Sequence, residues 1–347
     1  MRNQTITVAV FGASGYSGEE LLRILLKHRH VTISAITSRQ YAGQPVSTVF
    51  PRFAETGLQF SKPDVEAIAE QIDVAFLSLP HGLASEYAEP LLRKGVKVID
   101  ISADFRLRDI TIYEKYYACA HPAPDVLKQA VYGLPEIYRA TIKTAQLVAC
   151  AGCYPTSIIV PAAPLLAAGL FHTDSLVACS MSGVSGAGRK VDLPYIFPEC
   201  NESIRPYGVV GHRHLPEIEQ ELTAAAGGQT VTMNFIPHLA PVNRGIHSTI
   251  ILRPKASLSE ERLHEIWRDA YGGEPFVRVL PLGELADTKH VTLSNMVEIG
   301  LRFDPHTGNV VVSSAIDNLT KGAAGQAVQC MNLVCGLPET TALDVLG

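Results

Sequence analysis

The sequence predicts an α/β protein in which a Rossmann-type domain, with a doubly wound parallel sheet, accompanies an α+β domain whose sheet is mixed and largely antiparallel. The chain has 347 residues, more than a single core usually holds. Over the first 150 residues or so, short β-branched runs alternate with amphipathic stretches, which is typical of βαβ units. Farther along, strand-like runs follow one another with few helical stretches between them.

Composition excludes several classes of protein. Hydrophobic residues make up 47% and charged residues 18%, and the net charge is -5, so neither disorder nor a nucleic-acid partner is expected. We find no signal peptide before the first strand and no apolar run long enough to span a membrane. Seven scattered cysteines do not resemble a secreted disulfide framework. We therefore expect a cytoplasmic protein with no membrane partner.

Hydrophobic patterns place the individual elements. The expected parallel strands are residues 5–11, 31–37, 72–79 and 96–102, with helices at 19–26, 64–70 and 84–93. Pro63 and Asp64 supply a start for the second of these helices. The later strands are expected at 231–236, 248–252, 276–280, 297–303 and 310–314, and the later helices at 258–271 and 321–334.

A glycine-rich loop lies between the first strand and the first helix. Its three glycines repeat every third residue, and the positions expected to bind a dinucleotide are Gly12, Ser14, Gly15, Tyr16, Ser17 and Gly18. Glycines let the backbone approach a pyrophosphate, and the helix N-terminus offers free N–H groups. The spacing is GxxGxxG and not GxGxxG, so a glycine-rich turn without a ligand remains the alternative.

The end of the second expected strand predicts which dinucleotide binds. An NAD enzyme places an acidic residue on the ribose hydroxyls about 20 residues beyond the glycines. Here the chain has Ser38 and Arg39. A hydroxyl beside a permanently charged guanidinium suits a 2′-phosphate, so NADP(H) is preferred over NAD. The alternative is that Arg39 is a solvated loop charge.

Cys153 is the candidate nucleophile. It follows a strand-like segment and precedes an apolar stretch, residues 156–166, that can begin a helix. A helix N-terminus favours the thiolate, the form that attacks carbonyl carbon. From this segment alone, a buried structural cysteine is an equally good interpretation.

Several motifs now resemble one family, the N-acetyl-γ-glutamyl-phosphate reductases of arginine biosynthesis. The motifs cover nearly the whole chain in the family's order: GASGYSG at 12–18, SLPHG at 78–82, DFRL at 104–107, YGLPE at 132–136, GCYPT at 152–156, SGVSGAGR at 182–189, GHRHLPE at 211–217 and DNLTKG at 317–322. The resemblance implies the fold of glyceraldehyde-3-phosphate and aspartate-semialdehyde dehydrogenases. It also implies an NADP-binding domain of residues 1–152 with 320–347, and a catalytic and oligomerisation domain of residues 153–319.

The resemblance also implies a reaction and a catalytic pair. NADPH reduces N-acetyl-γ-glutamyl phosphate reversibly to N-acetyl-L-glutamate 5-semialdehyde and phosphate through a thioester on Cys153. His212 is the implied acid/base. His214, two residues on, would point to the opposite side of an extended segment and is expected to pack.

Other positions in the matched motifs are expected to hold the ligands. Arginines suit a substrate with a carboxylate and an acyl phosphate. The expected substrate-binding residues are Arg106, Arg189, Arg213 and Glu217, although each arginine has the alternative of a surface salt bridge. Pro80, Ser182, Gly183, Gly186 and Asn318 are expected at the cofactor, with residues 182–188 as a loop that closes on the nicotinamide. No metal is required, and we expect a homodimer or homotetramer.

One departure from the family concerns the residues before the nucleophile. The family commonly has Asn-Pro-Gly-Cys, whereas this chain has Cys150-Ala151-Gly152-Cys153. A CxxC motif allows a redox pair or half of a zinc site, but no second closely spaced pair of ligands accompanies it. Two rival functions remain. One is the same chemistry on another acyl phosphate, such as aspartyl or carrier-bound aminoadipyl phosphate. The other is an NADP-binding redox sensor that uses Cys150 and Cys153 and catalyses no reduction.

Overall fold

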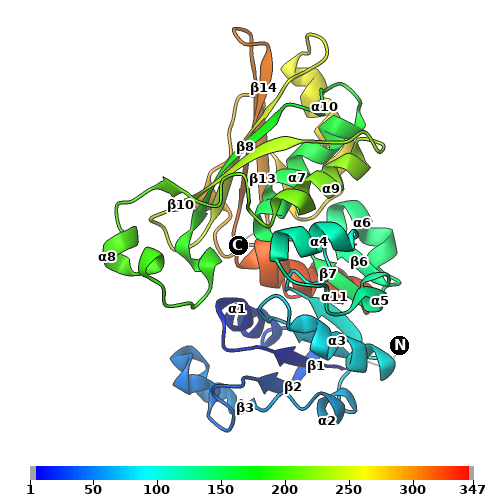
Figure 1. Cartoon of the computed structure of the whole chain (residues 1–347), viewed down its shortest axis with the longest axis vertical. Coiled ribbons are helices and arrows are strands. Elements are labelled where there is room, and N and C mark those ends of the chain that lie inside the picture. The colour runs from blue at the N-terminus through cyan, green and yellow to red at the C-terminus, as the bar shows by residue number, and fades with distance from the viewer. Residues whose placement is uncertain (1–4, 344–347) are drawn as a thin grey trace. The chain divides into compact units, whose positions relative to one another are not determined.

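The computed structural model describes residues 5–343, which form two compact units (Figure 1). Of the described residues, the first unit contains 5–151 and 323–343, and the second contains 152–322. One unit has a parallel sheet and the other a mixed sheet, so the predicted α/β class with a Rossmann-type domain is confirmed.

The first unit is built on a seven-stranded sheet whose strand pairs are all parallel. Its strands are β1 (Ile6–Phe11), β2 (Val31–Thr37), β3 (Phe60–Ser61), β4 (Val74–Leu77), β5 (Lys97–Asp100), β6 (Ala130–Gly133) and β7 (Leu147–Cys150). They lie in the order β3-β2-β1-β4-β5-β7-β6. The direction of winding therefore reverses between β1 and β4, which is where doubly wound sheets bind ligands.

Helices pack against this sheet because the strands are apolar on both faces. The helices are α1 (Tyr16–Leu25), α2 (Val65–Ala69), α3 (Ala84–Arg93), α4 (Ile110–Tyr117), α5 (Pro124–Leu127), α6 (Pro135–Ile142) and α11 (Gly325–Val334). Alternate strand residues such as Phe11, Leu77 and Val98 form one core with side chains of α2, α3 and α5. The C-terminal helix α11 packs against α1, α6 and the strands β5 and β7.

The second unit has a seven-stranded mixed sheet in the order β12-β13-β14-β11-β8-β10-β9. The strands are β8 (Leu176–Gly183), β9 (Arg205–Pro206), β10 (Met233–Ala240), β11 (Ile246–Leu252), β12 (Val277–Val279), β13 (Val297–Asp304) and β14 (Asn309–Ile316). Only the pairs β8–β10 and β12–β13 are parallel, so the sheet is largely antiparallel as predicted.

Three helices of the second unit, α7 (Cys153–Ala167), α9 (Leu215–Ala225) and α10 (Glu260–Tyr271), lie on the same side of this sheet (Figure 1). The central helix α7 is apolar all round and almost entirely buried, which is typical of a core helix. It begins at Cys153, so the packing of this helix sets the position of the candidate nucleophile. A fourth, short helix, α8 (Phe197–Cys200), lies between β8 and β9 in the chain.

Some elements differ from the prediction. The helix expected at 321–334 begins as a π-helical turn, Thr320–Ala324, before α11. Sequence patterns did not identify β8 or α9. In β8, polar and small residues such as Ser180 and Ser182 are buried, so the apolar alternation that usually marks a strand is weak.

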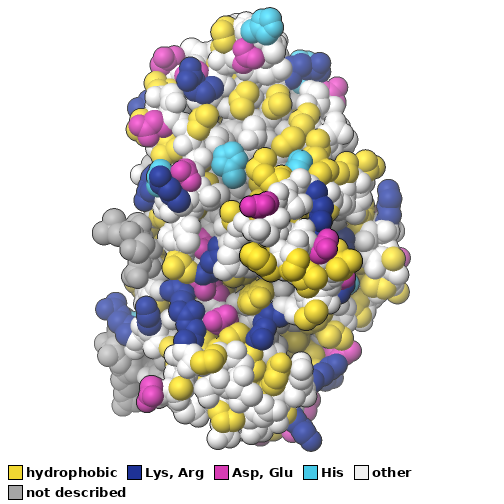
Figure 2. All heavy atoms as spheres, turned by 90° about the vertical axis from the view of Figure 1, so that its left-hand side faces the viewer, with side chains coloured by type: hydrophobic (Ala, Val, Ile, Leu, Met, Phe, Trp, Pro, Cys, Tyr) yellow, Lys and Arg dark blue, Asp and Glu magenta, His cyan; other side chains and the backbone are white. Residues whose placement is uncertain are grey.

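Exposed apolar side chains gather in one segment of the second unit. Between β8 and α9 the large exposed residues are Val191, Leu193, Ile196, Phe197, Ile204, Val209 and Val210. Figure 2 looks onto the side on which α8 projects in Figure 1 and shows hydrophobic side chains clustered there. Among residues 5–343, no helix combines the length and hydropathy needed to cross a membrane.

Candidate active site

Each of the three glycines in the glycine-rich loop meets a different structural requirement. Gly12 has a φ of 78°, and a Cβ there would lie 2.3 Å from the carbonyl oxygen of Ser78. A Cβ on Gly18 would lie 2.4 Å from the carbonyl oxygen of Ala13. Gly15 is the N-cap of α1 and has nothing within 4 Å of its Cβ position. The first and third glycines therefore permit close packing, and the second leaves open space at a helix N-terminus.

This loop lies at the switch point of the parallel sheet. It follows β1, and the next strand on that side, β4, ends in the segment that carries Ser78 and the exposed Pro80. The Ser78 N–H donates to the Phe11 carbonyl, which continues the ladder to the start of the loop. Ser14, Tyr16 and Ser17 are half-buried around Gly15. The described positions fit a pyrophosphate bound by backbone N–H groups.

The two residues expected at a 2′-phosphate lie beside the loop. The hydroxyls of Ser14 and Ser38 are 3.2 Å apart. Arg39 is exposed, and its guanidinium donates to the Tyr87 hydroxyl at 2.8 Å and to Glu86 at 3.2 Å. An exposed ion pair of this kind contributes little, so Glu86 does not prevent Arg39 from binding a phosphate.

Arg106 lies in a buried acidic cluster at the end of β5. Its guanidinium donates to the Ile101 carbonyl at 2.8 Å. Burial, and then the charge of Asp104, raise the pKa of Asp100 to about 7. Asp104 accepts from the N–H groups of Gly82 and Ala84 and thereby holds the start of α3. These contacts fit Arg106 as a residue that balances buried carboxylates.

Cys153 is the first residue of α7, and its side chain is half-buried. The preceding N-cap, Gly152, donates its N–H to the Glu217 carboxylate at 2.8 Å. Gly322 packs closely against Cys153, since a Cβ on Gly322 would lie 2.7 Å from the Cys153 Cβ. Cys153 therefore occupies a helix N-terminus, which favours a thiolate. Cys150, the other residue of the CxxC motif, is the buried last residue of β7.

Two tyrosines and a histidine cluster next to Cys153 in the second unit. The Tyr207 hydroxyl donates to the Tyr154 hydroxyl at 2.9 Å, and the Tyr154 hydroxyl donates to the His238 carbonyl at 3.3 Å. Burial is the main cause that raises the pKa of both phenols, and the charge of Cys153 adds to it. Both tyrosines therefore stay neutral donors beside the thiol.

The His212 ring packs edge-on against Tyr154, Tyr207 and Phe235. Its Nδ1 accepts the backbone N–H of His214 at 3.1 Å, so the proton of the neutral ring lies on Nε2. Burial, and then the charge of Arg213, lower the pKa of His212 to about 4. His212 is therefore neutral near pH 7 and offers an Nε2–H donor. The His214 ring lies 5.0 Å away, centroid to centroid, and also packs against Tyr154. The expectation that the two side chains point to opposite sides is therefore wrong, because this segment is a turn and not an extended strand.

The segment expected to close on the nicotinamide is held by Asn318. Its Oδ1 accepts the N–H of Gly245 at 2.7 Å, and its Nδ2 donates to the Ser185 hydroxyl at 3.0 Å. Ser182 and Gly183 are buried at the end of β8, whereas Gly186 is exposed. The Nδ2 end thus contacts the loop directly, and the Oδ1 end holds Gly245, whose carbonyl accepts the Gly183 N–H.

The other residues expected at the substrate differ in burial. Arg189 and Arg213 are exposed, whereas Glu217 is buried and bonded to the residue before Cys153. Sequence reasoning missed Tyr207 and assigned no role to Gly322. The signal for Gly322 was present, because it ends the DNLTKG motif. Tyr207 lies in no matched motif.

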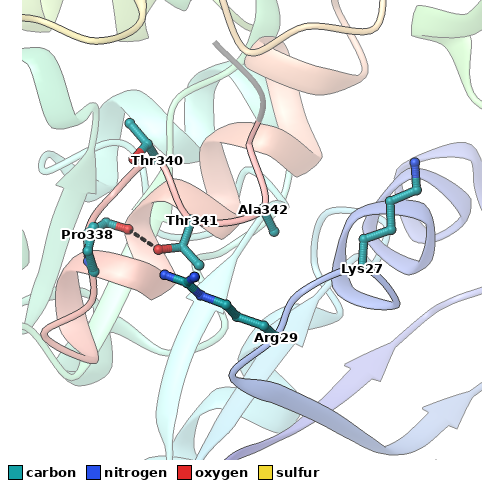
Figure 3. A pocket seen from close by; sticks show the side chains of 6 residues that line it. All are labelled: Lys27, Arg29, Pro338, Thr340, Thr341 and Ala342. Carbon is teal, nitrogen blue, oxygen red and sulfur yellow. Dashed lines mark hydrogen bonds between the residues drawn. The ribbon is translucent and has the colours of Figure 1, made fainter. Parts of the chain in front are cut away.

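A hollow of about 350 Å³ in the first unit is unrelated to the predicted positions. Figure 3 shows that Lys27, Arg29, Pro338, Thr340, Thr341 and Ala342 line it. In the same view the Thr341 hydroxyl bonds to the Pro338 carbonyl. None of the residues expected to bind substrate or cofactor lines this hollow.

Comparisons with known proteins agree with this organisation. The NAD-binding domain of semialdehyde dehydrogenases matches residues 7–145, and the dimerisation domain of semialdehyde dehydrogenases matches residues 153–318. Among solved structures, aspartate semialdehyde dehydrogenase II from Vibrio cholerae has a TM-score of 0.75 at 18% identity, covering 96% of this chain and 99% of that one. The Candida albicans enzyme, solved with NADP, has a TM-score of 0.72 at 16% identity, covering 95% and 99%. These likenesses show the fold.

Curated relatives narrow the family. The N-acetyl-γ-glutamyl-phosphate reductase of Akkermansia muciniphila is 55% identical over 98% of this chain and 99% of its own length. That of Symbiobacterium thermophilum is 49% identical over 98% and 97%. The resemblance seen in the sequence is therefore confirmed. The chain is an oxidoreductase of the semialdehyde dehydrogenase fold and belongs to the N-acetyl-γ-glutamyl-phosphate reductase family.

Proposed function

We propose that the protein reduces N-acetyl-γ-glutamyl phosphate reversibly to N-acetyl-L-glutamate 5-semialdehyde and phosphate, with NADPH as reductant, in arginine biosynthesis. The observation that carries the proposal is the place of Cys153. It begins a buried helix next to Tyr154, and that tyrosine packs against His212. The full-length relatives that bear this enzyme's name support the choice of substrate.

In the proposed first step, the Cys153 thiolate attacks the acyl carbon. The C–O bond to phosphate breaks, phosphate leaves with the electron pair, and a thioester remains on Cys153. The helix N-terminus favours the attacking anion because its free N–H groups carry partial positive charge.

In the second step, hydride adds to the thioester carbonyl carbon, and the tetrahedral adduct collapses to the aldehyde as the C–S bond breaks. Bound NADPH supplies that hydride. His212 donates its Nε2–H to the developing oxyanion and so stabilises the adduct. A neutral imidazole suffices for this role, in agreement with the lowered pKa of His212.

Features of the first unit support the choice of cofactor. The glycine-rich loop at the switch point fits a pyrophosphate, and Ser38 with Arg39 provides a hydroxyl and a guanidinium for a 2′-phosphate. The absence of an acidic residue at this position favours NADP over NAD. We propose NADP(H) on this chemistry.

The protein is expected to work as an oligomer. Residues 153–318 match the dimerisation domain of semialdehyde dehydrogenases. We propose a homodimer or homotetramer that covers the exposed apolar segment around α8, where Phe197 is 74% and Val191 is 91% exposed. Large exposed apolar patches usually mark interaction sites. No disulfide joins any of the seven cysteines, which all lie among the described residues, and this suits the reducing cytoplasm.

The test follows NADP reduction with N-acetylglutamate semialdehyde, with and without phosphate, in the wild type and in Cys153→Ser. We expect a rate that depends on phosphate and on NADP, and its loss in Cys153→Ser while NADPH binding is kept. A serine hydroxyl is far less acidic than a thiol, so it does not form the nucleophilic anion. Activity of Cys153→Ser, or turnover without phosphate, would contradict the thioester route.

The same assay separates the rival substrates. Aspartate semialdehyde and aminoadipate semialdehyde serve as competing substrates under identical conditions, and we expect the acetylated compound to have the highest kcat/KM. A redox sensor, in contrast, would bind NADP without turnover of any of them.

A further inference from the structure

Glu217 lies in the first turn of α9, the helix that packs against α7 in the second unit. Its side chain is buried, with the residue 1% exposed. The Oε1 atom accepts the N–H of Gly152 at 2.8 Å. A buried carboxylate thus meets the backbone directly before Cys153.

Hydrogen bonds hold the backbone of Gly152 at both its N–H and its carbonyl. The Gly152 carbonyl accepts from the Thr156 N–H and from the Thr156 hydroxyl, both at 2.9 Å. Gly152 itself is extended, with φ -65° and ψ 160°, and has no side chain that could cap α7. Because Glu217 holds the N–H side and Thr156 the carbonyl side, the backbone that leads into Cys153 has little freedom.

The charges of the proposed substrate favour no strong contact with Glu217. Acetylation turns the substrate nitrogen into a neutral amide N–H, a weaker partner for a carboxylate than an ammonium group, and the remaining groups, a carboxylate and an acyl phosphate, are anionic. A carboxylate repels both of these groups. No cation of the substrate is present to compensate the charge of Glu217, whereas a backbone N–H at a helix start is a favourable partner for it.

We propose that Glu217 is a positioning residue for Cys153, acting through the Gly152 N–H, and that it does not bind the substrate. The inference rests on the proposed function, in which Cys153 is the nucleophile. It differs from the expectation drawn from the family motif, which put Glu217 at the substrate.

The test compares Glu217→Ala, Glu217→Asp and Glu217→Gln with Glu221→Gln as matched control. Glu221 lies one turn further along α9 and is equally buried, and Gln220 donates to it. Two quantities are measured in each variant: kcat and KM for the semialdehyde, and the rate at which iodoacetamide alkylates Cys153, followed by mass spectrometry of the Cys153 peptide.

We expect Glu217→Ala to lower kcat and the alkylation rate together, by roughly ten- to a hundredfold, because a hydrogen bond to a charged group is lost. KM should stay near that of the wild type. Glu217→Gln keeps an acceptor oxygen and should restore most of both rates. Glu217→Asp shortens the side chain by one methylene group and should lengthen this hydrogen bond, so we expect it to resemble Glu217→Ala, and it replaces that variant if the alanine variant does not fold.

Three outcomes would overturn the proposal: a raised KM in Glu217→Gln with unchanged alkylation, unchanged kcat and alkylation in Glu217→Ala, or an equal loss in Glu221→Gln. The alkylation assay contains neither substrate nor cofactor. Failure of the positioning role therefore stays distinguishable from failure of the proposed function, which would show as activity of Cys153→Ser.

Discussion

The glycine-rich loop of the first unit and the Cys153 site of the second unit are built in different ways. The loop uses backbone, and its three glycines lie within seven residues, from Gly12 to Gly18. The Cys153 site uses side chains that come from distant parts of the second unit, among them Tyr207, His212 and Glu217. A backbone site tolerates many side-chain changes, whereas a side-chain site depends on every distant contact.

The difference also concerns charge. The loop presents N–H groups and open space at Gly15 to an anionic ligand. Around Cys153, by contrast, Tyr154, Tyr207 and His212 are all held in their neutral forms, because burial disfavours their charged forms. We therefore expect substitutions at the second site to act on kcat and those around the loop to act on KM for the cofactor.

The largest effect beyond Cys153 itself is expected at His212. His212→Asn removes the Nε2–H donor, and it should lower kcat by about 10²–10⁴-fold. His214→Asn should do markedly less, because His214 holds His212 through its backbone N–H. Steady-state kinetics of the two variants test this. If His214→Asn lowers kcat more than His212→Asn does, His214 and not His212 donates the hydrogen bond to the oxyanion.

The pH profile adds a second check on His212. Its pKa is lowered to about 4, so its protonation does not change between pH 6 and 8. If kcat of the wild type varies between pH 6 and 8, the same variation should therefore appear in His212→Gln. If the variation is lost in His212→Gln, His212 itself titrates between pH 6 and 8.

Gly322→Ala should have the next largest effect. The added methyl group would meet the Cys153 Cβ at 2.7 Å, and both atoms belong to buried backbone segments that cannot rotate away. A displacement of about 1 Å costs on the order of 10²-fold in rate. We expect kcat to fall while KM for NADP stays constant. Gly273→Ala is the matched control, because Gly273 is exposed, lies outside the positive-φ region and has nothing within 4 Å of its Cβ position.

Arg39→Leu should affect the cofactor alone. Loss of a charge-assisted contact to the 2′-phosphate corresponds to about 1.5–3 kcal/mol, which is roughly ten- to a hundredfold in KM for NADP. KM for NAD should change little. Equal effects on the two cofactors would remove Arg39 from the phosphate site.

Cys150→Ser should have the smallest effect in reductant. Cys150 is the last residue of β7, and its side chain is buried. We expect activity close to that of the wild type, together with loss of any reversible inactivation by mild oxidant. Inactivity of the reduced variant would show that Cys150 takes part in the reaction.

The two sites also differ in how far the sequence could predict them. The loop was predictable because a tight turn and a close approach need glycine at fixed spacing, and Gly12 and Gly18 meet those needs. Cys153 was predictable as a helix N-terminus because an apolar run follows it. The fold class followed from hydrophobic periodicity in the same way.

The remainder depends on tertiary contacts that no local pattern encodes. Tyr207 lies next to β9, a strand of two residues, and only the pairing of β9 with β10 explains its position. Arg106 is expected to bind the substrate, and its buried surroundings, which include the carboxylate Asp100, become visible only in the structure. Sequence alone could not place this carboxylate beside the arginine, because residues that come together in the fold at this point lie in a loop without periodic pattern.

The contact between Gly322 and Cys153 has a consequence for synthesis of the chain. Ribosomes add about 5–20 residues per second, so the segment that carries Gly322 emerges on the order of ten seconds or more after Cys153. Glu217 also follows the cysteine in the chain. The nascent polypeptide therefore carries Cys153 without the two contacts that fix its backbone, and the thiol reaches its reactive geometry only when synthesis is almost complete.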